Sequence, residues 1–240
     1  MLSGTTARMV TTDGHRLAFI EKEVGDTGDT SMDALIPKKA LLELVKISRD
    51  TGGDIQFGED QNHIYFETEG RLLITRKLSG NFPNYEMVMP KDNDKTVVFD
   101  LGEMRSAVRR VALMADERNR SIRVTVREGE VEITAQSSEE GEGAEVVPAE
   151  YSGEEVTLGF NHQYLQEFLN NVGALEAAGS ETDEAEAASD GSSAAAAPAR
   201  DTKGSTRVSF EFKDSNAATQ MRIAGDSAYD YKYIVMPLRI

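Results

Sequence analysis

The residues best able to do chemistry in this 240-residue chain lie together near its N-terminus, in Thr11–Leu17 (TTDGHRL). A carboxylate two residues from an imidazole, as in Asp13 and His15, could form an acid–base pair or bind a metal. Asp-Gly is also a turn sequence in which the aspartate accepts backbone hydrogen bonds, and we favour this interpretation. The other histidines, His63 and His162, do not stand at metal-ligand spacing from a cysteine or histidine.

The sequence carries no signature of a catalytic constellation. It has no phosphate-binding P-loop, no G-x-S-x-G nucleophile elbow and no dinucleotide-binding G-x-G-x-x-G. It has no cysteine, which excludes disulfides and thiolate metal ligands. We therefore predict a protein that is not an enzyme and uses no metal or cofactor. The alternative is an enzyme, a hydrolase that uses Asp13 and His15.

Composition bounds the class of protein. Hydrophobic residues make up 39% of the chain, enough for a packed core. No apolar run approaches the roughly 18 residues of a membrane span. The first eight residues lack the apolar region of a secretory signal. We expect a cytoplasmic protein.

The formal net charge of −16 is concentrated in two stretches. Ser137–Glu155 has seven acidic and no basic residues, and Glu176–Lys203 has seven acidic and two basic ones. These stretches carry −12 of the total, so the rest of the chain is close to neutral. Overall acidity therefore does not exclude a local basic surface for nucleic acid.

The second acidic stretch belongs to a low-complexity segment at about 174–205, rich in Ala, Ser, Gly and Glu. It has too few large apolar residues to offset the entropy of ordering, so we predict a disordered insert. An alanine-rich helix is the alternative, although Gly179, Gly191 and Pro198 interrupt it.

Outside this insert, the chain contains two α+β units of one design. The first has a helix opened by Pro37, and its strands are expected in a segment ending at Ile36 and at 55–57, 64–66 and 72–75. The second has helices from Leu101 to about Ala115 and from Asn161, and its strands are expected at 122–126, 131–134, 156–160, 208–212, 220–223 and 233–240. A hairpin turn is expected at Glu128-Gly129.

The first unit lacks a counterpart of the opening helix and hairpin of the second unit. We therefore predict a truncated domain at 1–93 and a complete one at 94–240, with the insert inside the second.

Two of these helices have a basic side. At about 100° per residue, the helix Pro37–Asp50 should bury one face and expose another. The expected buried residues are Ala40, Leu41, Leu44, Val45, Ile47 and Ser48, and the basic ones are Lys38, Lys39, Lys46 and Arg49. In the helix from Leu101 the apolar stripe is Leu101, Met104, Val108, Val111 and Ala115, flanked by Arg105 and Arg109. The basic sides are either ordinary solvated surfaces or a sequence-independent track for duplex DNA.

Leu113 and Met114 fall outside the apolar stripe of the second helix. They are either a surface pair or a patch that a partner covers.

The other end of the chain, Tyr233–Ile240 (YIVMPLRI), is an apolar strand that forms either core or the wall of a site. The segments TDGHRL, FPNY (Phe82–Tyr85) and VMPLR, at their spacing here, resemble the bacterial DNA polymerase III β sliding clamp family. The resemblance covers nearly the whole chain except the insert. It implies the DNA-clamp fold, with repeated units of antiparallel sheets and paired helices that line a pore.

The resemblance also implies a function. Members of this family encircle double-stranded DNA without reading its sequence, and tether DNA polymerase III and other clients that carry a short motif with a glutamine and a Leu/Phe pair. They form head-to-tail homo-oligomeric rings opened by a clamp loader. The client groove implied here consists of Thr12, Gly14, His15, Arg16, Leu17, Pro83, Val88, Asn161, Tyr164, Ile234, Val235, Met236, Pro237, Leu238 and Arg239.

By the same resemblance, the residues facing DNA are Lys38, Lys39, Lys46, Arg49, Arg105 and Arg109, and Leu113 and Met114 pack against the neighbouring subunit. Two residues depart from the family pattern, because Met87 and Asn119 stand where enterobacterial members place an arginine and a phenylalanine.

We expect the C-terminal two-thirds of such a clamp, without its first domain and unable to close the usual dimeric ring alone. The alternative is a stand-alone peptide-binding module that competes for clamp clients without encircling DNA.

Overall fold

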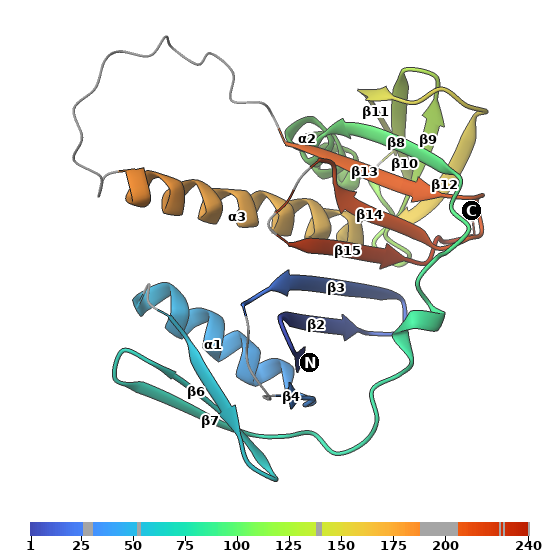
Figure 1. The fold of residues 1–240 in the computed structure, drawn as a ribbon. Coiled ribbons are helices and arrows are strands. Elements are labelled where there is room, and N and C mark those ends of the chain that lie inside the picture. Colours follow the sequence, from blue (N-terminus) through green and yellow to red (C-terminus); the bar gives the residue numbers. More distant parts are fainter. Residues whose placement is uncertain are drawn as a thin grey trace, which may run out of the picture. The chain divides into compact units, whose positions relative to one another are not determined.

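The computed structural model describes residues 1–25, 31–51, 54–137, 141–187, 206–225, 227 and 229–239 (Figure 1). The chain divides into one unit of Met1–Met9 and Glu21–Glu86 and another of Val10–Ile20 and Met87–Ile240. The division after Glu86 precedes the expected one after residue 93. The side chain of Asn93 donates hydrogen bonds to the carbonyls of Glu211 and Ala218, which holds the end of the connecting segment in the second unit.

The first unit is built from antiparallel strands and one long helix. Its strands are β1 (Leu2–Ser3), the beginning of β2 (Thr6–Thr12), the end of β3 (Arg16–Glu23), β4 (Ser31–Met32), β5 (Gln56–Glu59), β6 (His63–Thr68) and β7 (Arg71–Arg76). Strands β5, β6 and β7 form a sheet in that order, against which α1 (Lys38–Thr51) packs. A short 3₁₀ turn, η1 (Tyr85–Met87), begins at the end of this unit.

The strand expected to end at Ile36 ends earlier, because β4 covers only Ser31–Met32. The carbonyl of Leu35 accepts the N–H of Leu78 outside any sheet, at 2.9 Å. Pro37 then begins the helical hydrogen bonding, since its carbonyl accepts the N–H groups of Ala40 and Leu41. The helix therefore starts where the sequence predicts.

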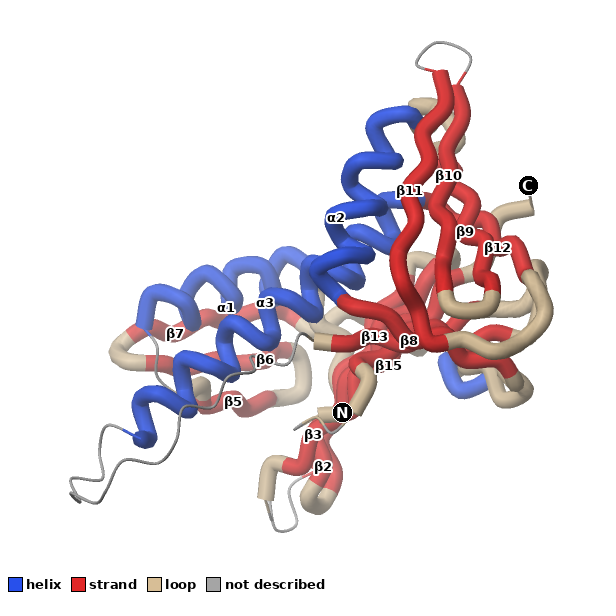
Figure 2. Tube along the Cα trace, turned by 90° about the horizontal axis from the view of Figure 1, so that it is seen from above, coloured by secondary structure: helices blue, strands red, loops and turns tan. Residues whose placement is uncertain are grey.

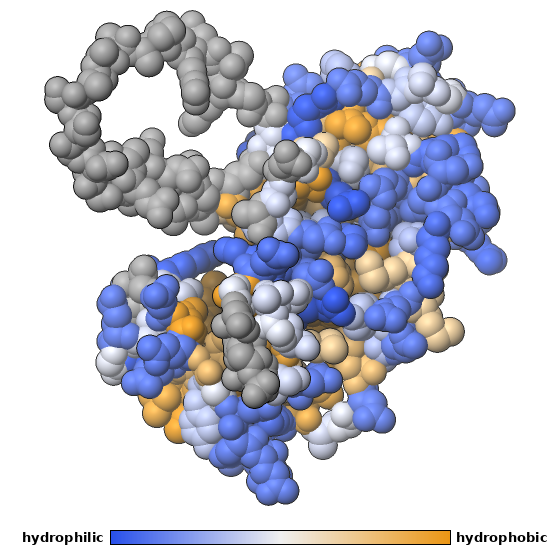
Figure 3. Space-filling model, viewed as in Figure 1, coloured by the Kyte–Doolittle hydropathy of each residue, from blue (hydrophilic) through white to orange (hydrophobic). Residues whose placement is uncertain are grey.

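Helix α1 buries a narrower face than predicted. Ala40 is buried and Leu41, Leu44, Ile47 and Ser48 are half-buried, as expected. Val45 was expected on this face but is 46% exposed. It lies about 140° from Ala40 around the helix, beyond the side that meets β6 and β7. Other hydrophobic side chains are also exposed on this unit (Figure 3), namely Leu42 of α1 and, outside that helix, Phe57, Leu72, Ile74 and Leu78.

The second unit is a larger antiparallel sheet with two helices. Its strands are β8 (Lys95–Asp100), β9 (Ser121–Arg127), β10 (Glu130–Ser137), β11 (Gly141–Glu150), β12 (Val156–Asn161), β13 (Arg207–Phe212), β14 (Thr219–Ile223) and β15 (Asp230–Val235). They lie in the order β12-β9-β10-β11-β8-β13-β14-β15, and β3 follows β15. The predicted hairpin is confirmed, because Arg127 pairs with Glu130 and Gly129 has φ +78° at the turn.

Helix α2 (Leu101–Val111) continues into a 3₁₀ turn, η2 (Ala112–Met114). Asp100 caps it, because its Oδ1 accepts the N–H of Glu103 at 2.7 Å, an interaction that stabilises a helix by about 1 kcal/mol. The predicted apolar stripe is confirmed, since all five of its residues are buried. Figure 2 shows α2 beside β10 and β11, with which it is in contact.

The core of this unit lies between the sheet and helices α2 and α3 (His162–Ala187). Phe210 of β13 is at its centre, with edge-to-face contacts to Phe99, Phe160 and Phe168 at ring distances of 4.8, 6.4 and 6.4 Å. Such aromatic pairs add to the stabilisation from burial itself. Phe168 thereby packs α3 against β13, and α3 also contacts β12.

The prediction of disorder from residue 174 is wrong for residues 174–187, which continue α3. The helix is anchored by buried Leu165, Phe168, Leu169 and Val172, so extending it through an Ala- and Glu-rich sequence avoids the cost of nucleation. The rest of the expected insert, 188–205, lies outside the described residues. No helix in the described part of the chain is long and apolar enough to cross a membrane.

Candidate functional site

The segment Thr11–Leu17 forms a tight turn between β2 and β3, held by its own side chains. Asp13 Oδ1 accepts the N–H groups of His15 and Arg16, both at 3.1 Å. Thr12 accepts the N–H of Gly14 and donates to the carbonyl of Arg16. Gly14 has φ +88°, a conformation that a residue with a side chain rarely adopts. The turn interpretation of Asp13 is therefore the one that the structure supports.

The carboxylate of Asp13 is therefore engaged in hydrogen bonds that hold the turn. Partial burial alone would raise the pKa of its carboxyl, but the N–H donors of His15 and Arg16 and the guanidinium of Arg16 lower that pKa below its ordinary value. Its second oxygen, Oδ2, binds Arg16 Nε at 3.0 Å. Within the described residues, no group of three or more His, Cys, Asp and Glu residues could hold a metal ion.

Arg16 connects the turn to two other elements of the second unit. Its Nη1 donates to the hydroxyl of Tyr233 on β15 at 2.9 Å and pairs with Glu167 of α3 at 2.6 Å. Its guanidinium carbon lies 4.3 Å from the ring centre of Tyr164, a cation–π arrangement. Burial raises the pKa of Tyr233, so the hydroxyl stays protonated and accepts from Arg16. Three segments thus meet at one side chain.

The C-terminal segment lies directly beside this turn. The N–H of Met236 donates to the carbonyl of His15 at 3.1 Å. Two residues on, Leu238 pairs with Gly159 of β12, and its N–H donates to the Gly159 carbonyl at 2.8 Å. The expectation of a strand running to the last residue is wrong, because β15 ends at Val235. Pro237 interrupts the hydrogen bonding, since proline has no N–H.

The predicted groove residues divide into a surface set and a buried set. His15 is exposed, Met236 is 47% exposed and Pro237 is half-buried. Leu17, Ile234 and Val235 are buried in the core and support the surface from beneath. A ligand could therefore contact the surface set directly. The buried set holds the surface residues in position.

Asn161 and Tyr164 are brought to the site by the start of α3. Asn161 ends β12, and its Oδ1 accepts the N–H of Gln163, which caps the helix. Asn119, one of the two departures from the family pattern, uses its side-chain oxygen locally to accept from the N–H and hydroxyl of Ser121.

Pro83, Met87 and Val88 lie on the segment that joins the two units. Pro83 is an exposed residue of the first unit, and its place in the groove stays a prediction. Met87 and Val88, at the start of the second unit's longer stretch, are also exposed. The membership of Val88 in the groove likewise stays a prediction.

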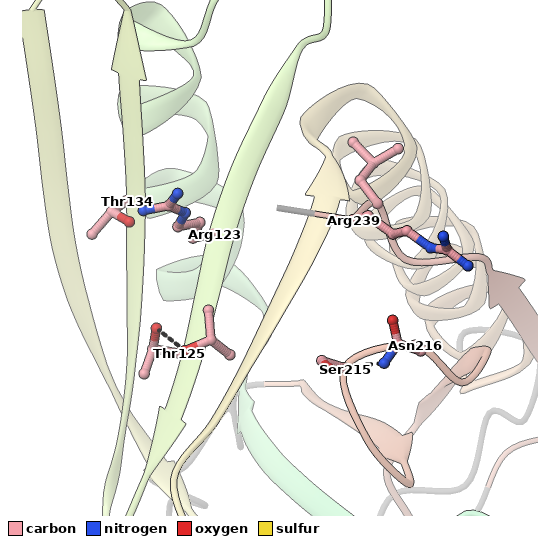
Figure 4. Close-up of a pocket in the computed structure, with 8 residues that line it drawn as sticks. Arg123, Thr125, Thr134, Ser215, Asn216 and Arg239 are labelled. Atoms are coloured by element: carbon pink, nitrogen blue, oxygen red, sulfur yellow. Dashed lines mark hydrogen bonds between the residues drawn. The ribbon is translucent and has the colours of Figure 1, made fainter.

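A cavity of about 570 Å³ adjoins the C-terminal segment (Figure 4). Of the predicted site residues, only Leu238 and Arg239 line it. The other lining residues are Arg123, Thr125, Thr134, Thr157, Ser215 and Asn216. Sequence reasoning missed them as site residues. The alternation in 122–126 places Arg123 and Thr125 on the polar face of their strand, but no sequence signal brings the 215–216 turn or the C-terminus to that face.

The basic residues of the helices are exposed as expected. On α1, Lys38, Lys39 and Arg49 are exposed, and Lys46 pairs with Glu43 at 2.9 Å. On α2, Arg105 and Arg109 are exposed, and the guanidinium of Arg105 lies close to Gly173 of α3. Their role as a DNA-facing surface stays a prediction.

The two residues predicted to pack against a neighbouring subunit, Leu113 and Met114, differ in exposure. Leu113 is 71% exposed, whereas Met114 is partly buried and packs close to Gly143 of β11. Nearby, Arg110 binds Glu145 with two hydrogen bonds of 2.6 and 3.0 Å. Leu113 alone therefore presents a large apolar surface at this position.

Known proteins are similar to this chain in sequence and in fold. A family model for the central domain of the DNA polymerase III beta subunit matches residues 1–84, and one for its C-terminal domain matches residues 86–180. Both models describe parts of one DNA sliding clamp. The chain belongs to this family, the beta sliding clamps of DNA polymerase III.

Curated relatives and solved structures agree. The beta sliding clamps of Pseudomonas aeruginosa and Pseudomonas putida are 34% and 32% identical over all 240 residues. A sliding clamp structure from Pseudomonas aeruginosa superposes with a TM-score of 0.80 at 29% identity, covering 100% of this chain and 56% of that one. One from Caulobacter crescentus gives 0.76 at 27% identity, covering 98% and 54%. The chain spans 56% of the length of the two curated relatives.

Proposed function

We propose that this chain is a subunit of a bacterial DNA sliding clamp, which encircles duplex DNA in the cytoplasm and tethers the replicative polymerase and repair proteins through a peptide-binding groove. Membership of the beta sliding clamp family supports the proposal. The observation that carries it is the junction of the TDGHRL turn with the C-terminal segment, joined by the hydrogen bond from Met236 to His15.

The chemistry of this junction suits a short linear motif. Met236 offers an adaptable apolar side chain, and Pro237 and the Tyr164 ring offer rigid apolar surface. The exposed imidazole of His15 and the side-chain NH2 group of Asn161 offer polar groups that can orient a glutamine. Tethering by such a groove requires no bond chemistry, because it acts by raising the local concentration of the client on DNA.

Fluorescence anisotropy with a labelled peptide that carries a glutamine and a Leu/Phe pair tests the groove. We expect saturable binding, and none for the same peptide with alanine at those three positions. Equal binding of both peptides, or of neither, would contradict the proposed groove.

Encirclement of DNA needs a separate test, in which the protein is retained on closed circular DNA and lost when the circle is cut. The basic residues of α1 and α2 supply sequence-independent attraction to phosphates. Light scattering on the same sample measures whether a closed oligomer forms. Peptide binding by a monomer that is not retained on circles would favour the stand-alone peptide-binding module.

A further inference from the structure

The cavity beside the C-terminus lies on the polar face of β9, β10 and β12, where charges are distributed unevenly. At one end of this face, Arg127 pairs with Glu130, Glu132 and Glu155, at 3.9, 3.0 and 2.7 Å. One arginine therefore offsets only part of the negative charge of these three acids. At the other end, Arg123 has no ion pair with any residue that the structure describes. A positive charge thus remains at the cavity end of the face.

The register of the strands explains this separation. Arg123 lies opposite Thr134 of β10 and Gly159 of β12, so neither neighbour offers a carboxylate. Thr125 lies opposite Thr157, and the two hydroxyls are hydrogen-bonded at 3.1 Å. Two hydroxyls have two protons and use one between them, so one proton remains to be donated to a ligand.

The remaining wall comes from segments far away in sequence. Pairing of Leu238 with Gly159 brings the C-terminal segment to the strand next to Arg123 and adds Arg239, which has no ion pair within the described residues. Ser215 and Asn216 lie on the turn between β13 and β14, across the cavity from Arg123 and Thr134 (Figure 4). That turn is fixed by Asp214, whose carboxylate accepts the N–H groups of Asn216 and Ala217.

We propose that this cavity binds a carboxylate of the client peptide, from an acidic residue that flanks the motif held at the His15–Met236 junction. The inference rests on the proposed function. Two arginines that have no acidic partner among the described residues, together with several hydroxyl and amide donors, form a lining suited to an anion. The C-terminal segment runs from the His15–Met236 junction to the cavity. Met236 is hydrogen-bonded to the TDGHRL turn, and Leu238, two residues later, borders the cavity.

A peptide is favoured over a nucleic acid because of the surrounding charge. The neighbouring turn carries Asp214, and the strand face carries the three acids around Arg127. A compact carboxylate can be held by one arginine and the neighbouring hydroxyl and amide donors, whereas an extended phosphate backbone would also meet these acids.

The test compares peptides that share the Gln and Leu/Phe motif and differ only in a two-residue extension, Asp-Asp or Asn-Asn, placed at either end. At low ionic strength we expect one Asp-Asp peptide to bind about fivefold more tightly than its Asn-Asn partner. The preference should disappear in Arg123→Gln and in Arg239→Gln. It should persist in Arg76→Gln, which removes an equal charge from an exposed position on β7.

The unextended motif peptide separates the two proposals. We expect Arg123→Gln to bind it as the wild type does, because Arg123 is outside the proposed groove. Equal affinity for both extensions in the wild type, a preference that survives in both arginine variants, or displacement of the acidic peptide by an equimolar single-stranded oligonucleotide would overturn the carboxylate subsite. Failure of every peptide to bind would overturn the proposed function and with it this inference.

Discussion

Arg16 and Tyr233 are 217 positions apart in sequence, yet the guanidinium of one donates to the hydroxyl of the other at 2.9 Å. The same guanidinium binds Glu167 and Asp13 and lies over the ring of Tyr164. One side chain therefore fixes the TDGHRL turn against both β15 and the start of α3. The proposed groove depends on this junction more than on any surface residue.

Replacing Arg16 with alanine should lower both stability and peptide affinity. The substitution removes a hydrogen bond, two ion pairs and a cation–π contact, and leaves the buried Tyr233 hydroxyl without its donor. We expect a loss of about 1–3 kcal/mol in the free energy of unfolding, measured by denaturant titration. Binding of the motif peptide should weaken at least about tenfold, an effect of roughly 1.4 kcal/mol.

The matched control is Arg109→Ala on the exposed side of α2. It should change the free energy of unfolding by less than about 0.5 kcal/mol. An Arg16→Ala protein that binds peptide with wild-type affinity would show that the junction does not form the site.

The effect of Asp13→Asn should depend on pH. The pKa of Asp13 is lowered in the folded protein, so its ionised carboxylate stabilises the fold above the unfolded-state pKa of 3.8. This stabilisation is lost as the pH falls through the lower, folded-state pKa. Because the carboxylate is half exposed, we expect the variant to be less stable than wild type by up to about 1 kcal/mol at pH 7.

Denaturant titrations of both proteins at pH 7 and at several values below 4 measure this difference. Comparing them at each pH cancels the titration of all other groups. A difference that stays constant down to the lowest pH would mean that the charge of Asp13 does not contribute.

Periodic patterns in the sequence predicted those elements whose burial follows their own local geometry. The buried stripe of α2 and the β9–β10 hairpin are of this kind, because a helix or hairpin places its side chains by spacing alone. Val45 was misplaced because the width of a buried helix face is set by the partner sheet, which the pattern does not contain.

The extension of α3 was missed for a related reason. Each glycine, such as Gly179, destabilises a helix by about 1 kcal/mol, and this favoured the prediction of disorder over a helix. The buried start of α3 nucleates the helix, so extending it requires no further nucleation. Similarly, the cavity joins Arg123, the 215–216 turn and Arg239, which only the sheet order brings together. The contact of the TDGHRL turn with the C-terminus was expected from family resemblance, and no periodicity predicts it.

The core around Phe210 should account for much of the second unit's stability. Phe210 is fully buried among three other phenylalanines, so Phe210→Ala leaves a cavity. We expect it to lower the free energy of unfolding of this unit by about 3–5 kcal/mol. The control is Leu72→Ala, at a residue of the first unit that is 58% exposed, where truncation to alanine should cost less than about 1 kcal/mol. Equal effects of the two substitutions would contradict the described core.

Removal of the last five residues, beginning at Met236, should abolish binding of the motif peptide while the second unit stays folded. Strand β15 ends at Val235, so the deletion spares its pairing with β14 and the buried Tyr233, Ile234 and Val235. It removes the hydrogen bonds to His15 and Gly159 and the exposed Met236 side chain. Circular dichroism and thermal melting should show a folded protein, and anisotropy should show no binding. A truncated protein that binds the peptide with unchanged affinity would place the client site elsewhere on the molecule.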